Sequence, residues 1–267
     1  MIPTIRESVK EKHPLIHCIT NPISINQCAN ALLAVGARPM MAEHPKEVEE
    51  ITGTADALML NLGNITDVRM ESMMTAAKTA KAKGTPIVLD AVGVACSTLR
   101  RNFALALIDT AMPTVIKGNY SEILALCRES YRSSGVDAEA TLTETAIGTA
   151  AAEFARQYGC IIIASGKTDI VMDGDRLFRI HNGTDQLASV TGTGCMLGAI
   201  CAAYLSARPD VSAAVAACAV LGIAGEYAQT ERGMGSFMVS LMDALSTLQD
   251  ANIIQDLKME ERPLEQQ

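Results

Sequence analysis

Residues 188–205 read ASVTGTGCMLGAICAAYL, and this stretch decides the fold. It predicts a short β-like segment over residues 189–191, a glycine turn, and then a long helix of small residues that starts near Cys195. The first N–H groups of such a helix have no partner within it, and the helix dipole places about half a positive charge at this end. The turn at Gly192, Thr193 and Gly194 therefore predicts an anion site, with an ordinary turn into a buried helix as the alternative.

Cys195 follows the glycine turn directly. A helix N-terminus favours the thiolate form of a cysteine in its first turn, so a proton acceptor would lie beside the anion site. We therefore predict that Cys195 is the catalytic residue. The alternative is a small buried hydrophobic residue, which is a common role for a free cysteine.

The composition indicates one large α/β domain. The chain has 267 residues, of which 49% are hydrophobic and 3% are aromatic, and it contains no tryptophan. This suits tightly packed helices on a parallel sheet and gives little material for base stacking. A formal net charge of −8 argues against nucleic acid or an anionic membrane as partner.

The cysteines and the apolar segments indicate a cytoplasmic protein. The eight cysteines are scattered and form no C-x-x-C pair, which is typical of reduced thiols. The first residues are charged and lack the apolar core of a signal peptide, and we judge the longest apolar runs too short to span a membrane.

Strand and helix patterns alternate along the chain. Predicted strands cover residues 14–20, 37–42, 57–62, 87–90, 113–116 and 160–164, and helical patterns follow them. A hairpin is predicted over residues 170–180, a surface loop over 128–144 and a frayed tail over 258–267. We therefore predict a single domain over residues 1–267, with a three-layer α/β/α fold and a mainly parallel sheet.

Polar residues follow several of these strands, at the sheet edge where ligands bind in such folds. Asp90 and Glu122 lie at two strand ends, and a pair of carboxylates near a phosphate suits Mg²⁺, often reached through water. Lys117 could offset the charge of nucleotide phosphates, and Ser165 could contact the nucleotide. Each of these side chains has a plain alternative as a cap, a turn residue or a solvated group.

Several other chemistries are excluded by missing motifs. The sequence has no G-x-S-x-G elbow and no G-x-x-x-x-G-K-[ST] loop, and we assign no zinc site, because His17 lies inside an apolar strand and His44 beside a proline. A serine hydrolase, a P-loop kinase and a zinc enzyme are therefore not predicted. Any handling of ATP must depend on the glycine turn.

Six segments together resemble the hydroxyethylthiazole kinase family, a ribokinase-like family of thiamine salvage. The resemblance covers nearly the whole chain, and the segments occur in the family's order. They are LIHCITNPISINQCANALLAVGARPMMA (15–42), VLDAVGV (88–94), VIKGNYSEI (115–123), SGKTD (165–169), VTGTGCMLGA (190–199) and GMGSF (233–237).

The resemblance implies ATP-dependent phosphorylation of the primary hydroxyl of 4-methyl-5-(2-hydroxyethyl)thiazole, with Mg²⁺ as cofactor. It implies that the glycine turn holds the transferred phosphoryl group, and that Cys195 stands where ribokinase relatives carry an acidic residue. A homotrimer with active sites between subunits is also implied. The implied contacts are Lys117 and Ser165 for ATP, Asp90 and Glu122 for magnesium, and Met41, Asn21 and Gly192 for the thiazole.

The chain departs from the family pattern at a few positions. Family members commonly have arginine where Lys117 stands and a small residue where Tyr120 stands, and the loop after Asp90 carries Ala91 and Ala95 in place of proline and glycine. A lysine keeps the positive charge but cannot make the two parallel hydrogen bonds with which an arginine guanidinium binds a phosphate. Two rival functions stay open: a ribokinase-like kinase for another small alcohol, and a nucleotide-dependent binding protein or lyase that transfers no phosphate.

Overall fold

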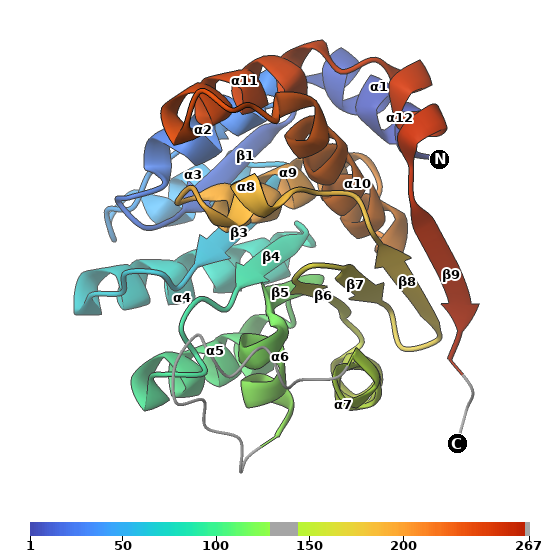
Figure 1. The fold of residues 1–267 in the computed structure, drawn as a ribbon. Coiled ribbons are helices and arrows are strands. Elements are labelled where there is room, and N and C mark those ends of the chain that lie inside the picture. The colour runs from blue at the N-terminus through green and yellow to red at the C-terminus, as the bar shows by residue number, and fades with distance from the viewer. Residues whose placement is uncertain (129–143, 265–267) are drawn as a thin grey trace.

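The structure is a computed structural model that describes residues 1–128 and 144–264 (Figure 1). The described strands form one sheet in the order β2-β1-β3-β4-β5-β6-β7-β8-β9. Neighbours are parallel from β2 to β6 and antiparallel from β6 to β9, which confirms the predicted mainly parallel sheet. The bounds are β1 Leu15–Ile19, β2 Arg38–Met40, β3 Ala57–Asn61, β4 Ile87–Asp90, β5 Val115–Asn119, β6 Ile161–Ser165, β7 Asp169–Met172, β8 Arg176–Ile180 and β9 Met259–Pro263.

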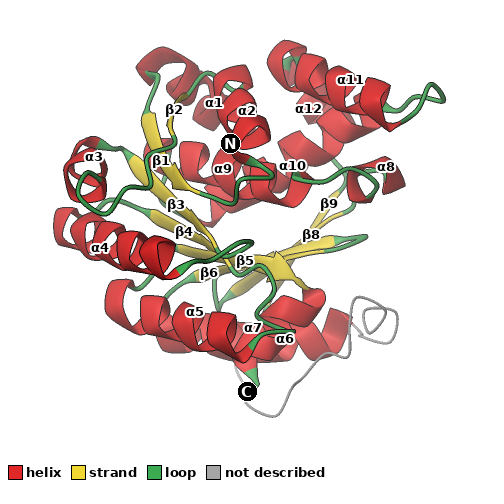
Figure 2. Ribbon diagram, turned by 90° about the vertical axis from the view of Figure 1, so that its left-hand side faces the viewer, coloured by secondary structure: helices red, strands yellow, loops and turns green. Residues whose placement is uncertain are grey.

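Helices cover both faces of the sheet and give the predicted three layers (Figure 2). One face carries α4 to α7, and the other carries α1, α2 and α9 to α11. Each parallel crossover passes through a helix, as parallel strands require. The bounds are α1 Ile2–Lys12, α2 Ile25–Ala34, α3 Val48–Thr54, α4 Asp67–Lys83, α5 Thr98–Ala111, α6 Tyr120–Cys127, α7 Glu144–Tyr158, α8 Asp185–Ala188, α9 Thr193–Ala207, α10 Val211–Ala228, α11 Met234–Thr247 and α12 Asp250–Asp256.

The apolar strands supply two core clusters because successive side chains point to opposite faces of the sheet. In β3, Met59 packs in the cluster that contains α9 and α10, whereas Leu58 and Leu60 pack in the cluster that contains α4 and α5. All five residues of β3 are buried. This double burial explains why the central strands read as continuous apolar runs.

The helix α10 corrects one expectation from the sequence. By length and composition it could cross a membrane, which differs from the expectation that the apolar runs are too short. In the fold, however, 89% of this helix is buried against other parts of the protein. It is therefore a core helix, packed between α9 and α11.

Three local predictions differ from the structure. Residues 189–191 are not β-like, because Thr184 caps the short helix α8 and the chain then turns directly into α9. β5 continues past residue 116 to Asn119, because Lys117 to Asn119 pair with β6. The tail is not frayed over residues 259–263, because these residues pair as β9 with the edge strand β8. The predicted surface loop falls almost wholly on residues 129–143, outside the described residues.

Candidate active site

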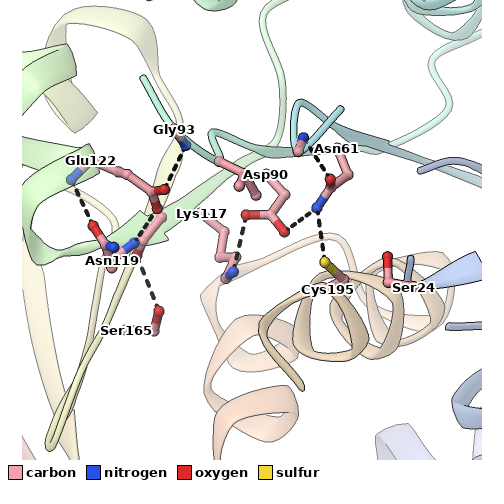
Figure 3. Close-up of polar contacts among 12 residues, drawn as sticks. Ser24, Asn61, Asp90, Gly93, Lys117, Asn119, Glu122, Ser165 and Cys195 are labelled. Carbon is pink, nitrogen blue, oxygen red and sulfur yellow. Dashed lines mark hydrogen bonds and ion pairs between the residues drawn. The ribbon is translucent and has the colours of Figure 1, made fainter. Parts of the chain in front are cut away.

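The carboxyl ends of the parallel strands carry a row of polar side chains in mutual contact (Figure 3). Asn21 follows β1, Asn61 ends β3, Asp90 ends β4, and Lys117 lies in β5. Asn21 Nδ2 donates to Asn61 Oδ1 over 3.0 Å, Asn61 Nδ2 donates to Asp90 Oδ2 over 2.6 Å, and Lys117 Nζ donates to Asp90 Oδ1 over 3.0 Å. Four adjacent strands thus present one continuous hydrogen-bonded row at the edge where ligands bind in such folds.

Asp90 and Lys117 form an ion pair that is almost completely removed from solvent. Burial raises the pKa of the Asp90 carboxyl to about 6, against the opposing attraction of Lys117. Burial alone would lower the pKa of Lys117, but the negative charges of Asp90 and Glu122 raise it above its ordinary value. At neutral pH the aspartate is therefore ionised and the lysine protonated, so each compensates the other.

Cys195 lies next to this row, in the first turn of α9, with its sulfur facing Asn61 (Figure 3). Its side chain is half-buried. Asn61 Nδ2 donates to Cys195 Sγ over 3.3 Å, and Asn21 Nδ2 donates to the same sulfur over 3.4 Å. The structure therefore brings Cys195 and Asn21 together, as expected, and adds Asn61 between Cys195 and Asp90.

The N-terminus of α9 has no side-chain cap. Gly192 is the N-cap residue at φ +92°, a conformation that favours glycine, and no side chain caps the helix. The Thr193 hydroxyl points away from the helix end and donates to Leu187 O over 2.8 Å. A Cβ on Gly194 would lie 3.1 Å from Lys117 Nζ, so the buried ammonium stands close to the same helix end.

Glu122 serves as a cap for two backbone segments. Its Oε2 accepts from Asn119 N, while Asn119 Oδ1 accepts from Glu122 N, which makes a capping box at the start of α6. Its Oε1 accepts from Gly93 N over 2.7 Å, which fastens the loop after β4. Both carboxylate oxygens are thus engaged by backbone N–H groups.

The two carboxylates predicted to handle Mg²⁺ are both hydrogen-bonded within the protein. Asp90 is fully buried and its oxygens bond to Lys117 and Asn61, while the Glu122 oxygens bond to backbone amides. Among the described residues, no group of three or more His, Cys, Asp or Glu side chains could hold a metal ion.

Ser165 and Met41 lie toward opposite ends of the row. Ser165 ends β6, is half-buried, and its Oγ donates to Gly118 O over 3.3 Å. Met41 directly follows β2 and packs, half-buried, against the cluster that holds α2 and α9. The strand order therefore puts Ser165 on the Lys117 side of Cys195 and Met41 on the Asn21 side.

Asn61 is the site residue that the sequence reasoning missed. It is fully buried and makes contact with Asn21, Asp90 and Cys195. A signal was present, because Asn61 ends the apolar run ALMLN as Asp90 ends PIVLD. A polar residue at the carboxyl end of a buried parallel strand points to the ligand edge of the sheet.

Comparison with known proteins gives a consistent result. The model of the hydroxyethylthiazole kinase family matches residues 6–251. Hydroxyethylthiazole kinase 2 of Clostridium botulinum (strain Hall) is 44% identical over 260 residues, covering 96% of this chain and 98% of the relative. The structure of a hydroxyethylthiazole kinase protein from Pyrococcus horikoshii superposes with a TM-score of 0.88 at 36% identity, covering 98% of each chain.

A more distant similarity places the fold in a wider group. A ribokinase-like superfamily protein from Enterococcus faecalis superposes with a TM-score of 0.70 at 14% identity, covering 92% of this chain and 93% of that one, which supports the ribokinase-like architecture alone. The family match, by contrast, spans the strand-end row, the glycine turn and Cys195. On this evidence the chain belongs to the hydroxyethylthiazole kinase family.

Proposed function

We propose that this chain transfers the γ-phosphoryl group of ATP to the primary hydroxyl of 4-methyl-5-(2-hydroxyethyl)thiazole, as a step of thiamine biosynthesis in the cytoplasm. One observation carries the proposal: the N-terminus of α9, without a side-chain cap, lies beside Cys195 and the buried Lys117. Membership of a kinase family supports this reaction. Residues 1–267 act in the proposal as a single kinase domain.

The anion hole is assigned to Gly192, Thr193 and Gly194. The backbone N–H groups at the start of α9 would hold the oxygens of the transferring group, where the helix dipole favours negative charge. Lys117 adds a full positive charge close to this point. Since phosphoryl transfer depends mainly on positioning and charge stabilisation, these groups would supply much of the catalysis.

The acceptor alcohol is assigned to the neighbourhood of Cys195. Its oxygen would form the new bond to the γ-phosphorus while the bond from that phosphorus to the β–γ bridging oxygen breaks and ADP leaves. The hydroxyl proton would pass to Cys195 Sγ, which accepts two amide N–H groups and is half-buried. In a loose transition state this proton leaves late, so the base contributes only part of the rate.

The remaining contacts follow the row of strand ends. Lys117 and Ser165 would bind ATP on one side of Cys195, and Met41, Asn21 and Gly192 would bind the thiazole on the other. A polarisable methionine suits a flat ring that contains sulfur. Gln27 supports a ligand here, because its buried Oε1 has no partner among the described residues and its side chain lies 3.6 Å from the Cβ position of Gly192.

Magnesium stays in the proposal as an ion that arrives with the nucleotide. Asp90 and Glu122 would contribute negative charge near it, and neither is proposed as an inner ligand. When bound, the ion would neutralise charge on the nucleotide phosphates. Where family members commonly have arginine, Lys117 supplies the positive charge as a single ammonium group. Its ion pair with Asp90 holds this group in place.

A coupled ADP assay tests the reaction. We expect ADP formation that depends on both hydroxyethylthiazole and Mg²⁺, and no comparable rate with a hydroxymethylpyrimidine or a sugar. Glu122→Gln would leave one backbone N–H without an acceptor and remove a charge, so it should raise the magnesium concentration needed for half-maximal rate. An unchanged magnesium titration in this variant would restrict Glu122 to its capping role.

A further inference from the structure

The amide of Asn61 uses all of its hydrogen-bonding positions. Its Oδ1 accepts from Gly63 N over 2.9 Å and from Asn21 Nδ2 over 3.0 Å. Its Nδ2 donates to Asp90 Oδ2 over 2.6 Å and to Cys195 Sγ over 3.3 Å. A primary amide has two donor hydrogens and an oxygen with two lone pairs, so this side chain is fully satisfied.

The direction of this network is set by a backbone group. The Gly63 N–H can only donate, so the Asn61 atom that faces it must be the oxygen. The opposite orientation would also set the amide oxygen against the Asp90 carboxylate at 2.6 Å, where neither atom has a hydrogen to share. Asn61 Nδ2 must therefore face both Asp90 and Cys195.

The orientation of Asn21 follows from that of Asn61. Because Asn61 presents its oxygen to Asn21, the Asn21 atom in this contact must be the nitrogen, whose second hydrogen points to Cys195. Cys195 Sγ consequently receives two N–H donors, over 3.3 and 3.4 Å. Both donors come from nearly buried side chains, since Asn61 is 0% exposed and Asn21 is 6% exposed.

We propose that Asn61 is a positioning residue that holds the sulfur of Cys195 as a hydrogen-bond acceptor, with its polarity fixed by Gly63 N–H and Asp90. The two fixed N–H donors hold the sulfur in place, and hydrogen bonds of this kind are stronger when the acceptor carries charge, as sulfur does in the form of a thiol that attacks an electrophile. The remaining acceptor capacity of the sulfur is then left for the hydroxyl of the substrate. This last step, a hydrogen bond from the substrate hydroxyl to the sulfur, rests on the proposed function. The hydrogen bonds from Asn21 and Asn61 to the sulfur require no substrate.

Alkylation of the ligand-free protein tests the effect on the thiol. Asn61→Asp keeps the shape of the side chain and its acceptor oxygen but removes the N–H group that donates to Cys195. An ionised carboxylate has no hydrogen to donate, and a protonated carboxyl would donate its one hydrogen to Asp90. We expect iodoacetamide to modify Cys195 about 3- to 10-fold more slowly at pH 7 in this variant. The loss of one hydrogen bond to the charged sulfur slows the reaction, and a higher nucleophilicity of the sulfur offsets part of that loss. Peptide mass spectrometry separates Cys195 from the exposed Cys96, which serves as the internal reference.

The matched control is Asn64→Asp, which adds the same charge on an exposed residue of the same loop. It should leave the ratio of Cys195 to Cys96 modification unchanged. If Asn61→Asp does not fold, Asn61→Leu removes the same donor at similar volume without adding charge, and it carries the same expectation. Thermal unfolding is recorded for each variant.

The outcomes separate the inference from the proposed function. If folded Asn61 variants modify Cys195 at the parental rate or faster, Asn61 only fills space and the inference is wrong. If modification slows, kcat should also fall, and by a larger factor than KM for ATP rises, because Asn61 contacts Cys195 directly but reaches Lys117 only through Asp90. Slow modification in a protein that forms no ADP with hydroxyethylthiazole would uphold the inference about the thiol and reject the proposed function.

Discussion

Cys195 receives hydrogen bonds from two side-chain amides, and this environment suits an acceptor atom of either sulfur or oxygen. A required general base is typically worth about 10²–10⁴ in rate. Because the acceptor proton leaves late in a loose transition state, we expect Cys195→Ala to keep its fold and to lose no more than about 10³-fold in kcat. Steady-state kinetics and thermal unfolding measure both effects.

Cys195→Asp distinguishes a proton acceptor at this position from a small buried hydrophobic residue. A carboxylate is already ionised at neutral pH and would accept the same N–H groups from Asn21 and Asn61, so we expect this variant to remain active. If Cys195 were only a small buried hydrophobic residue, Cys195→Ala would be fully active and Cys195→Asp would be unfolded or inactive. A folded, inactive Cys195→Asp beside a fully active Cys195→Ala would therefore contradict a role as base.

Among the elements of the fold, a buried histidine in β1 is hydrogen-bonded to the chain that follows β2. His17 is fully buried, its Nε2 donates to Ala42 O and its Nδ1 accepts from the hydroxyl of Thr52, so the neutral ring satisfies both partners. Burial lowers the pKa of His17 below its ordinary 6.5, against the raising effects of Ala42 O and Glu47. The unfolded chain therefore binds a proton at a higher pH than the folded one.

This difference predicts a loss of stability in mild acid. The stabilising contribution of neutral His17 is complete above pH 6.5 and declines as the pH falls below it, because only the unfolded state gains a proton there. His17→Gln should lower Tm at pH 8 and flatten its fall between pH 8 and 5. If parent and variant have parallel Tm curves over this range, His17 does not titrate as described.

Helix α10 must approach the loop after β8 closely. A Cβ on Gly222 would lie 2.5 Å from the backbone oxygen of Asn182, closer than such atoms approach without movement. We expect Gly222→Ala to destabilise the protein by about 1–3 kcal/mol, the usual cost of overpacking. Denaturant unfolding measures this change.

Gly53→Ala is the matched control for that substitution. Gly53 also lies in a helix, α3, but a Cβ there meets nothing within 4 Å. Alanine at this position should be neutral or stabilise by up to about 1 kcal/mol, because it restricts the unfolded chain and favours helix. An equal change in stability in the two variants would show that contact with Asn182 does not govern the effect at Gly222.

The elements themselves were largely predictable from the sequence. The central strands are buried on both faces, so they read as apolar runs, and α4 and α5 each begin after a residue type that favours helix N-caps, Thr66 and Ser97. Pairing with a distant strand was not visible locally: β5 extends because β6 lies beside it, and β9 forms because β8 offers an open edge.

The site was predictable in part, for a similar reason. Its location at the strand ends follows from topology, and charged residues such as Asp90 stand out in a sequence. The position of Asn61 at the end of an apolar strand was visible in the sequence, but its contacts with Asn21, Asp90 and Cys195 depend on three segments that meet only in the fold. The hydrogen bonds of Glu122 could not be predicted from the sequence for the same reason. Its two carboxylate oxygens accept from Gly93 N and Asn119 N.

At the scale of the molecule, we expect a homotrimer with active sites between subunits. Exposed apolar side chains lie just before α2, within α2 and in β2, which supports an apolar contact with another copy: Ile23 is 63% exposed, Leu33 57% and Met40 37%. Met41 follows directly in the chain, so such a contact would bring it near a neighbouring site. Light scattering that gives a monomer would contradict the trimer.

Mixed trimers test whether subunits share a site. Chains with Met41→Asp and chains with Cys195→Ala each carry one defect, and exchange of subunits should restore partial activity if the two residues serve one site from different chains. Native mass spectrometry first establishes that the subunits have exchanged. No recovery in exchanged trimers would show that each site is complete within one chain.

Transfer of phosphate to the thiazole alcohol at the N-terminus of α9 can be followed with ATP labelled at the γ-phosphate. The labelled ATP is incubated with hydroxyethylthiazole and Mg²⁺, and the products are separated by chromatography. We expect label in thiazole phosphate in equal amount to the ADP formed, and loss of this product when Gly194→Asp places a carboxylate in the proposed anion hole. Label that appears only as inorganic phosphate, or transfer that survives Gly194→Asp undiminished, would contradict the proposed transfer.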